Sequence, residues 1–597
     1  MTRLRAGLAV CLVLLLLLSG RLFFLQGLDP EAVAQEATSN RTRTVQIDPA
    51  RGDILDAHGR TLATSVIRYD LVVDQKWYEE EFTRRNQETG EREDVTIHSV
   101  IGELEPLLGV DAETLRASLI PTDPEDPVRY SVVAKSVTPE VKERVLELGI
   151  PGMTTKQRSD RQYPNASLAG TLLGFLSAAS LNEAEQETGA EGIELTQEEH
   201  LAGTPGERTF EVGADGIRIP MATYSETPAV DGQDVKLTID SDIQWAAQNA
   251  VMQKQEQYNP DFVAAIVMEI ETGNLIAVAD STSVDPNDPA ATEGEFRRSK
   301  ALLHAFEPGS TGKLATFAAA LDAGKVTPTE AFEVPNAYTV QNETINDSLE
   351  HATYDMTAAG IFARSYNTGT VMIGNRLSNE ERYDFFQKFG VGQYLPIGLP
   401  VSQGIFADPA VWDRRQQFTT MFGQAYTQTL LHTAMQFGSI ANDGLKVQPR
   451  LVDAYIDPDG TEHEAESPAP ERVVSQETSD ILLGMMETVV TNGTAQGAAI
   501  DGYRVGGKTG TGQAAGPNGG YDGYTSSFTG VAPLDDPKYV VAVTMHRPQG
   551  NWRDWSVTDT FKTIMEQTLN TYDVPPSNSA PDPYKVFIGD RQDYGWE

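Results

Sequence analysis

A serine and a lysine near the middle of the chain have the spacing of a nucleophile and its base. Ser310 and Lys313 are three residues apart in the sequence Glu-Pro-Gly-Ser-Thr-Gly-Lys at residues 307–313. The Pro-Gly pair predicts that a helix begins near Ser310, which puts both side chains on one helical face. A lysine whose pKa is lowered by burial can take the proton of a serine hydroxyl, and the N–H groups at a helix start suit an oxyanion. The pair therefore indicates covalent catalysis by serine.

Taken alone, Ser310 also fits the simpler role of a helix N-cap, for which serine is a preferred residue. Of all the lysines in the chain, only Lys313 has a serine three residues before it. The choice between a nucleophile and a cap therefore depends on patterns elsewhere in the chain.

Two further patterns carry polar side chains at short spacing. Ser365-Tyr366-Asn367 offers a hydroxyl and an amide that in a loop can relay a proton and hold a peptide carbonyl, although Ser180-Leu181-Asn182 matches the same pattern. Lys508-Thr509-Gly510-Thr511 follows a strand-like segment, where glycine lets a ligand approach closely. The lysine and the hydroxyls of this pattern could bind a carboxylate. The simpler interpretation of the pattern is a turn with a surface lysine.

The order of the three patterns decides between these interpretations. S-x-x-K, S-x-N and K-T-G begin 55 and 143 residues apart, in the order that characterises penicillin-recognising serine enzymes. The eight histidines are scattered without metal-binding spacing, so we expect no metal and no other cofactor.

Further motifs accompany these patterns along nearly the whole chain. They are Arg51-Gly52-Asp53-Ile54-Leu55-Asp56 with Gly59-Arg60-Thr61-Leu62-Ala63, Arg161-Gln162-Tyr163-Pro164, Leu173-Gly174-Phe175, Gly192-Ile193-Glu194, Leu201-Ala202-Gly203, Gly493-Thr494-Ala495, and Ser527-Phe528-Thr529-Gly530 with Ala532-Pro533. Together with the catalytic patterns they make the chain resemble a class B penicillin-binding protein, and the first motif is similar to the signature that opens the pedestal domain of that family.

The resemblance implies a serine D,D-transpeptidase that cross-links peptidoglycan stem peptides and is trapped by β-lactams. It implies that Ser310 attacks the D-Ala-D-Ala bond, that Lys313 is the general base, and that Ser365 passes the proton to the leaving amine. Binding of the substrate peptide and its carboxylate is implied for Asn367, Lys508, Thr509, Gly510 and Thr511, and an oxyanion hole for the backbone N–H groups of Ser310 and Thr511.

Alternatives remain within and beside this family. A D,D-carboxypeptidase or a β-lactam-hydrolysing enzyme shares the three patterns and differs in using water to resolve the acyl-enzyme. A β-lactam sensor should carry a signalling module on several membrane spans, and an inactive scaffold is disfavoured because every motif residue is intact. No stretch before the pedestal is long enough for a glycosyltransferase domain, which argues against a bifunctional class A member.

The chain is expected to divide into four parts. Residues 1–26 form a cytoplasmic N-terminus and a membrane anchor, because Ala6–Gly20 carries no charge and Arg3 and Arg5 precede it. A cleaved signal peptide is the alternative, with Ala32-Val33-Ala34 as a small-residue cleavage site. Residues 27–226 form the pedestal, 227–573 the transpeptidase domain and 574–597 a loose, proline-rich tail.

The order of strand-like and helix-like segments in the catalytic part predicts an α+β fold. Strand-like segments at 262–268 and 275–279 precede a helix-rich stretch, and strands return at 503–507, 528–531 and 539–544. The family resemblance implies a five-stranded antiparallel sheet flanked by helices, with an all-helical subdomain, on an extended pedestal with one transmembrane helix.

The expected partners follow from charge and from the resemblance. A formal net charge of −40 opposes binding to nucleic acid. The family implies a polytopic glycan polymerase and division-complex membrane proteins as partners. The stretch from Arg21 to Arg51 resembles the division-specific branch, which implies a place in the cell membrane at midcell, with an elongation-specific role as the alternative.

Overall fold

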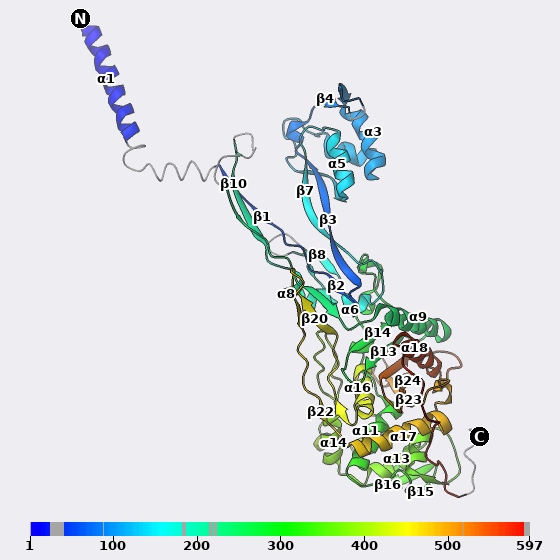
Figure 1. The fold of residues 1–597 in the computed structure, drawn as a ribbon. Helices are drawn as coiled ribbons and strands as arrows, with labels where there is room; N and C mark the ends of the chain where they lie inside the picture. The colour runs from blue at the N-terminus through cyan, green and yellow to red at the C-terminus, as the bar shows by residue number, and fades with distance from the viewer. Residues whose placement is uncertain are drawn as a thin grey trace.

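A computed structural model describes residues 2–23, 41–86, 89–181, 187–213, 219, 224–516 and 519–589 (Figure 1). Several sequence-based expectations therefore fall partly or wholly outside the described residues. They concern the end of the anchor at 24–26, the start of the pedestal at 27–40 with the alternative cleavage site at 32–34, the part of the division-type stretch at 24–40, and the end of the tail at 590–597.

Helix α1 (Thr2–Phe23) stands apart from the folded body (Figure 1). Its leucines and valines are exposed to a degree unusual for a soluble helix, because none of the other described residues covers them. In the described part of the chain it is the one helix long and apolar enough to cross a membrane. This is consistent with the single-span anchor expected from the sequence.

The pedestal is an elongated body built on one long strand. Strand β3 (Thr61–Val73) pairs antiparallel with β7 (Met153–Gln162) along most of its length, and its last part pairs antiparallel with β6 (Ser131–Val137) on its other side. A three-stranded sheet of β1 (Thr42–Ile47), β10 (Gly206–Glu211) and β11 (Tyr224–Thr227) lies on the side of α1 (Figure 1). The pedestal thus separates the apolar helix from the catalytic part.

The far end of the pedestal is a lobe with a core of its own. It contains the hairpin of β4 (Glu81–Arg85) and β5 (Arg92–Thr96) with helices α3 (Ile97–Leu108), α4 (Ala112–Leu119) and α5 (Pro139–Glu147). Apolar side chains from these elements bury each other, including Phe82, Val100, Leu104 and Leu115. The side chains of Thr96, Asp111 and Thr138 accept hydrogen bonds from the first N–H groups of the three helices, which fixes where each helix begins.

One sheet joins the pedestal to the catalytic part. Strand β12 (Asp234–Leu237) pairs in parallel with β2 (Ile54–Leu55) of the pedestal and antiparallel with β20 (Val452–Ile456) of the catalytic part. The two parts are therefore connected by a shared hydrogen-bonded ladder close to the boundary expected at residues 226 and 227.

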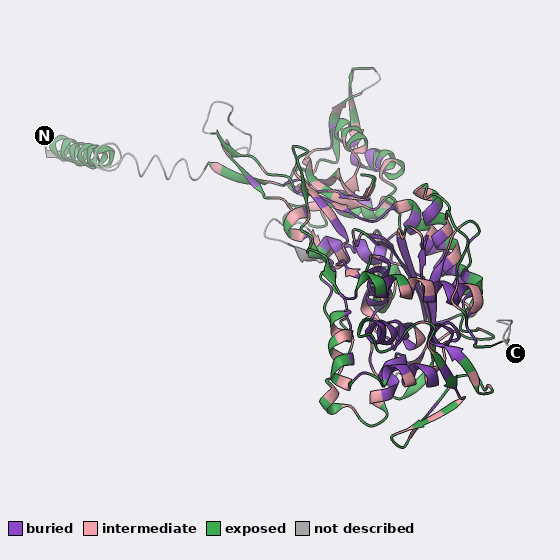
Figure 2. Ribbon diagram, turned by 60° about the horizontal axis from the view of Figure 1, so that its bottom comes forward, coloured by how far each residue is buried: buried purple, intermediate pink, exposed green. Residues whose placement is uncertain are grey.

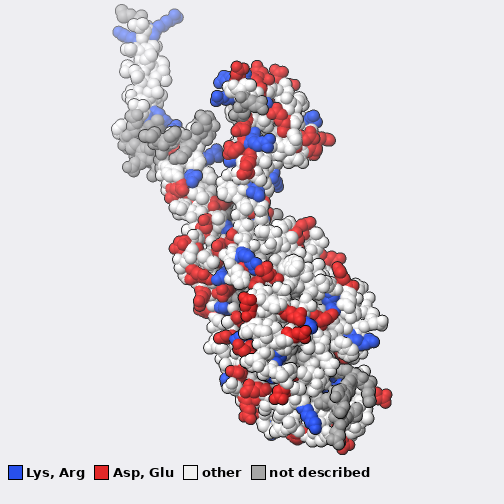
Figure 3. All heavy atoms as spheres, turned by 45° about the vertical axis from the view of Figure 1, so that its right-hand side comes forward, with Lys and Arg blue, Asp and Glu red and all other residues white. Residues whose placement is uncertain are grey.

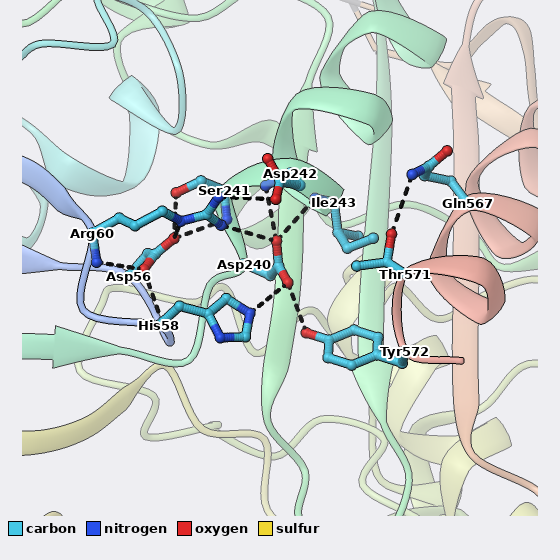
Figure 4. Close-up of polar contacts among 10 residues, drawn as sticks. All are labelled: Asp56, His58, Arg60, Asp240, Ser241, Asp242, Ile243, Gln567, Thr571 and Tyr572. Carbon is cyan, nitrogen blue, oxygen red and sulfur yellow. Dashed lines mark hydrogen bonds and ion pairs between the residues drawn. The ribbon is translucent and has the colours of Figure 1, made fainter. Parts of the chain in front are cut away.

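A polar cluster ties the same joint together (Figure 4). The carboxylate of Asp240 accepts the N–H groups of Asp242 and Ile243 at the start of α9 (Ser241–Tyr258), at 2.8 and 3.2 Å. It also lies 2.9 Å from Nε2 of His58 in the β2–β3 turn and accepts the hydroxyl of Tyr572 at 3.1 Å. One buried carboxylate thus links the pedestal turn with α9 and the residue that follows α18 (Thr558–Thr571).

The catalytic part contains a five-stranded antiparallel sheet in the order β14-β13-β25-β24-β23. The strands are β13 (Phe262–Glu269), β14 (Leu275–Asp280), β23 (Gly506–Ala515), β24 (Tyr521–Ala532) and β25 (Tyr539–His546). Helices α9 and α18 pack on one face and α16 (Leu430–Ala441) on the other (Figure 1). Buried residues are concentrated in the interior of this part of the molecule (Figure 2). Every residue of β25 is buried because both faces are covered, which explains its almost continuous apolar sequence.

A helix-rich subdomain completes the catalytic part. Its main helices are α11 (Lys313–Asp322), α12 (Ala358–Arg364), α13 (Asn367–Gly374), α14 (Asn379–Lys388) and α17 (Gln476–Asn492). Between α11 and α12 it also contains two small ladders, β15 (Ala331–Val334) with β18 (Tyr354–Thr357), and β16 (Ala337–Val340) with β17 (Glu343–Asn346). The expected α+β class and five-stranded antiparallel sheet are confirmed, whereas the subdomain expected to be all-helical also contains these two ladders.

The expectation of a loose tail is wrong for residues 574–589. Val586 is fully buried and Phe587 nearly so. The N–H of Thr357 donates to the Val586 carbonyl at 3.1 Å, and the N–H of Tyr584 donates to Oγ1 of Thr488 at 2.9 Å. The prolines prevent regular structure, but the apolar pair that follows them still packs on the helical subdomain.

Candidate active site

The expected nucleophile lies in a tight turn pressed against the edge of the catalytic sheet. Ser310 belongs to a 3₁₀ turn, Gly309–Gly312, that leads into α11 at Lys313. Gly309 has φ +55°, and a Cβ there would lie 2.3 Å from the Thr511 carbonyl oxygen of β23, so only glycine fits. The helix start expected at Ser310 is thus a 3₁₀ turn followed by an α-helix. Ser310 remains partly exposed while Lys313 is fully buried.

The amine of Lys313 points at the second pattern. Its Nζ donates to the carbonyl oxygen of Ser365 and lies 3.2 Å from Oγ of the same residue. Burial lowers the pKa of Lys313 to about 7, although the nearby Asp347 carboxylate acts in the opposite direction. An amine with this pKa is available as a base at neutral pH.

The amine of Lys508 contacts the same hydroxyl. Its Nζ lies 2.9 Å from Oγ of Ser365 and donates to its neighbour, the Thr509 carbonyl, at 3.1 Å. Burial and the adjacent Lys313 amine both lower the pKa of Lys508. The hydroxyl of Ser365 therefore lies between two amines, where it can accept from one and donate to the other, as a proton relay requires.

The backbone around Ser365 makes a sharp turn between two helices. Ser365 ends α12 in the left-handed region at φ +65°, which is uncommon for a serine and is held here by the contact with Lys313. Asn367 begins α13, where its N–H donates to the Asp347 carboxylate and its side-chain amide donates to the Asn346 carbonyl at 3.3 Å. The serine and the asparagine of S-x-N are thus fixed by different elements.

The third pattern lies on β23, at the edge of the sheet beside the nucleophile turn. A Cβ at Gly510 would lie 2.7 Å from the Pro308 carbonyl oxygen, so glycine permits the close packing of strand and turn. The hydroxyls of Thr509 and Thr494 are 2.7 Å apart. Thr511 is partly exposed, next to the Gly309 contact, which places its backbone close to Ser310.

The three patterns, distant in the sequence, meet in one place. Ser365, Lys313 and Lys508 are in direct contact, and Ser310 lies one turn before Lys313 on the same element. Asn367 and the Lys508–Thr511 segment border this cluster from α13 and β23. The arrangement offers a nucleophile, a buried base and a relay hydroxyl beside an edge strand.

Sequence reasoning missed the acidic residues around this cluster. The side chain of Asp347 is 2% exposed and contacts the start of α13, but an isolated aspartate between Asn346 and Ser348 resembles an ordinary turn residue. Glu307, also buried, accepts from the Ala425 N–H at 2.9 Å. No spacing rule identifies either residue, because their partners lie far along the chain. Within the described ranges, no cluster of three or more His, Cys, Asp and Glu residues has an arrangement that could hold a metal ion.

Known proteins are similar to this chain over nearly its whole length. Residues 263–566 match the penicillin-binding protein transpeptidase domain, and residues 46–237 match the penicillin-binding protein dimerisation domain. Penicillin-binding protein PbpB of Mycolicibacterium smegmatis is 31% identical, over 97% of this chain and 91% of that protein. Peptidoglycan D,D-transpeptidase FtsI of Escherichia coli is 27% identical, over 95% of this chain and 91% of that protein.

A solved structure agrees with these relatives. The crystal structure of penicillin-binding protein 3 from Mycobacterium tuberculosis complexed with ampicillin superimposes with a TM-score of 0.68 at 26% identity. The match covers 91% of this chain and all of that one. With both domain matches, relatives over nearly its whole length and this shared architecture, the chain belongs to the class B penicillin-binding proteins.

Proposed function

We propose that this protein is a peptidoglycan D,D-transpeptidase whose acyl-enzyme forms on Ser310. The observation that carries the proposal is the position of the Ser365 hydroxyl, 3.2 Å from the amine of Lys313 and 2.9 Å from that of Lys508. Lys313 itself follows Ser310 by one turn. Membership of the penicillin-binding proteins and the similarity to a named D,D-transpeptidase support it.

The first half-reaction forms an ester on Ser310. Oγ of Ser310 attacks the carbonyl between the two D-alanines while the unprotonated amine of Lys313 takes its proton. The backbone N–H groups of Ser310 and Thr511 stabilise the oxyanion. The amide bond then breaks, the proton passes through Ser365 to the leaving nitrogen, and the terminal D-alanine departs as a free amine.

The second half-reaction forms the cross-link. The side-chain amine of a second stem peptide attacks the ester, a new amide bond forms, and the proton lost by that amine returns to Oγ of Ser310. An acceptor amine must reach the ester before water does, and this competition separates a transpeptidase from a carboxypeptidase or a β-lactam-hydrolysing enzyme.

The remaining pattern residues bind the donor peptide. The hydroxyls of Thr509 and Thr511 and the charge of Lys508 suit its terminal carboxylate, and Gly510 lets the chain approach the strand. Asn367 holds the peptide carbonyl at the start of α13. A β-lactam copies the reactive amide and leaves a stable ester on Ser310.

Fluorescent-penicillin labelling tests the proposal. The full chain in detergent should be labelled, and peptide mapping should place the adduct on Ser310. Ser310→Ala should lose the label, while Ser467→Ala, which changes an exposed serine in a distant loop, should keep it. An adduct on another residue, or full labelling of Ser310→Ala, contradicts the mechanism.

The location, the partners and the division into domains form a second part of the proposal. We infer that α1 is a single-pass anchor with its N-terminus in the cytoplasm, since Arg3 and Arg5 precede its apolar run. Residues 27–226 then form the pedestal and 227–573 the transpeptidase domain outside the cell membrane. The resemblance of the segment from Arg21 to Arg51 to division-type members supports a midcell position beside a polytopic glycan polymerase.

Depletion of the protein tests the division role. Depleted cells should grow without dividing, and a fluorescent fusion should gather at midcell. Cells that lose their shape but still form septa would favour the elongation role.

A further inference from the structure

Asp347 is a buried carboxylate beside the active site that the mechanism above does not use. It lies in the segment between β17 and β18, outside all three catalytic patterns, and its side chain is 2% exposed. A carboxylate buried to this extent loses its hydration, so its hydrogen-bond partners and charged neighbours must stabilise it.

On one side, Asp347 caps the helix that begins with Asn367. Its Oδ1 accepts the N–H groups of Asn367 and of Thr368, the latter at 3.2 Å, and its Oδ2 accepts the Thr368 hydroxyl at 2.7 Å. The first N–H groups of a helix have no acceptor within the helix. The N-cap position of α13 is occupied by Tyr366, a residue type that is not a preferred cap, and Asp347 supplies the cap from 20 residues away.

On its other side, Asp347 contacts His351. Nε2 of His351 lies 3.0 Å from Oδ2 of Asp347, and Nδ1 lies 2.7 Å from the Ala352 carbonyl oxygen. Each ring nitrogen of His351 thus has an oxygen within hydrogen-bonding distance. The imidazole ring stacks on the rings of Tyr366 and Tyr354, with centroid distances of 4.2 and 5.3 Å. Polar contacts at its nitrogens and stacking on its faces therefore both fix its position.

The charge of Asp347 also acts on the base. It raises the pKa of Lys313 against the larger effect of burial. The charged groups that face Lys313 are Asp347 from the segment after β17 and Lys508 from β23, and Lys508 in turn faces Asp554. Asp347 itself faces His351 and the start of α13, so it is the one acidic group in this set that touches the S-x-N segment.

We propose that Asp347 is the positioning residue of this active site: its carboxylate holds Asn367 at the start of α13 and places a negative charge opposite Lys313. The inference rests on the proposed function, because it concerns the same nucleophile and base. Lys313 contacts the carbonyl oxygen and the hydroxyl of Ser365, and Asp347 accepts the backbone N–H of Asn367, so the S-x-N segment is held at both of its ends.

Two substitutions separate the hydrogen bonds of Asp347 from its charge. Asp347→Ala removes both. Asp347→Asn keeps an oxygen for the N–H groups of Asn367 and Thr368, and its amide nitrogen can donate to Nε2 of His351 while Nδ1 of the ring donates to the Ala352 carbonyl oxygen. The asparagine variant therefore keeps the cap and loses the charge.

A matched control lies in the pedestal lobe. Asp111 caps α4 by accepting the N–H groups of Glu113 and Thr114 at 3.0 and 2.9 Å and the Thr114 hydroxyl at 2.7 Å. These three contacts reproduce those that Asp347 makes with α13. Asp111→Ala and Asp111→Asn thus report the cost of losing a cap far from the active site.

The experiment measures the second-order rate constant for acylation of the full chain by a fluorescent penicillin, across the pH range in which Lys313 titrates. Asp347→Ala should lower this constant by about 10- to 100-fold, the effect of misplacing a reacting group. Asp347→Asn should move the rising limb of the pH profile to lower pH, because Lys313 without a facing carboxylate loses its proton more readily. Both Asp111 variants should acylate at the wild-type rate with an unchanged profile.

The outcomes separate this inference from the proposed function. If the wild-type chain is labelled on Ser310 but both Asp347 variants keep the wild-type rate and profile, the positioning role is wrong and the transpeptidase proposal stands. If Asp347→Ala does not fold, the pH profile of Asp347→Asn decides, and an unshifted limb overturns the inference. A wild-type chain without label on Ser310 contradicts the proposed function itself.

Discussion

Two buried lysines on either side of one serine hydroxyl set the chemistry at the scale of single residues. The amines of Lys313 and Lys508 both contact Ser365, and burial is the largest cause lowering the pKa of each. Like charges in a dry site repel strongly, so this pair favours a state with fewer than two charges. In the proposed mechanism, the amine that stays unprotonated is the base for Ser310.

Replacing Lys313 tests this account. Lys313→Ala should lower the rate constant for acylation of Ser310 by at least about 10²-fold, the low end for loss of a general base. Lys313→Arg should not restore it, since a guanidinium stays protonated. In the wild type the rate should rise with pH through about 7, because loss of a proton from Lys313 creates the base. Fast acylation by Lys313→Arg would place the base elsewhere.

Residue type and spacing were enough to predict which three patterns form the candidate site, because few residue types can serve as a nucleophile, a base or a proton relay. Ser310, Ser365 and Lys508 belong to short motifs that can be recognised from sequence alone. Asp347 could not be found in this way, since the helix start that it caps lies 20 positions later and its local sequence resembles a turn. Tertiary capping leaves no periodic signal.

At the scale of elements, the site depends on how closely the nucleophile turn packs on β23. Sequence patterns located β13, β14, β24 and β25, whose apolar runs are buried. The strand expected at Tyr503 begins instead at Gly506, because the strand is rich in glycines that carry no apolar pattern. The glycines of β23 allow the nucleophile turn to pack closely against the strand.

Gly309→Ala tests this packing. Its φ of +55° and the Thr511 carbonyl oxygen, 2.3 Å from the position of a new Cβ, both oppose a side chain. The left-handed backbone alone costs about 1–3 kcal/mol, and the clash adds to it by displacing the turn. Gly324→Ala is the control, with φ +64° and open space around the new Cβ. The rate of acylation of Ser310 should fall sharply in Gly309→Ala and stay near the wild-type value in Gly324→Ala. Equal rates in the two variants would show that acylation does not need the close packing of the turn on β23.

At the scale of the whole molecule, a shared sheet and a polar joint connect the pedestal and catalytic part, while acidic side chains spread over both (Figure 3). The change in composition near Thr227 indicated a boundary, but composition cannot show that β12 crosses it by pairing with β2 and β20. The buried end of the tail was missed for a similar reason, since a short apolar pair among prolines gives no pattern.

Asp240→Ala tests the joint. The variant loses the cap of α9 and the contacts with His58 and Tyr572, so the free energy of unfolding should fall by about 1–3 kcal/mol. Thermal unfolding measures this loss, and Asp242→Ala, which changes an exposed neighbour paired with Arg60, should lose less. Labelling of Ser310 should persist in both variants at low temperature, and its loss in Asp240→Ala would connect the joint to catalysis.

The measurement that bears most directly on the central claim compares D-alanine release with cross-link formation by the full chain on uncross-linked peptidoglycan. A transpeptidase that resolves its Ser310 ester with an amine should form one cross-link for each D-alanine released, and penicillin or Ser310→Ala should abolish both. Release of D-alanine without cross-links would make water the acceptor and contradict the assignment, as would cross-linking that survives in Ser310→Ala.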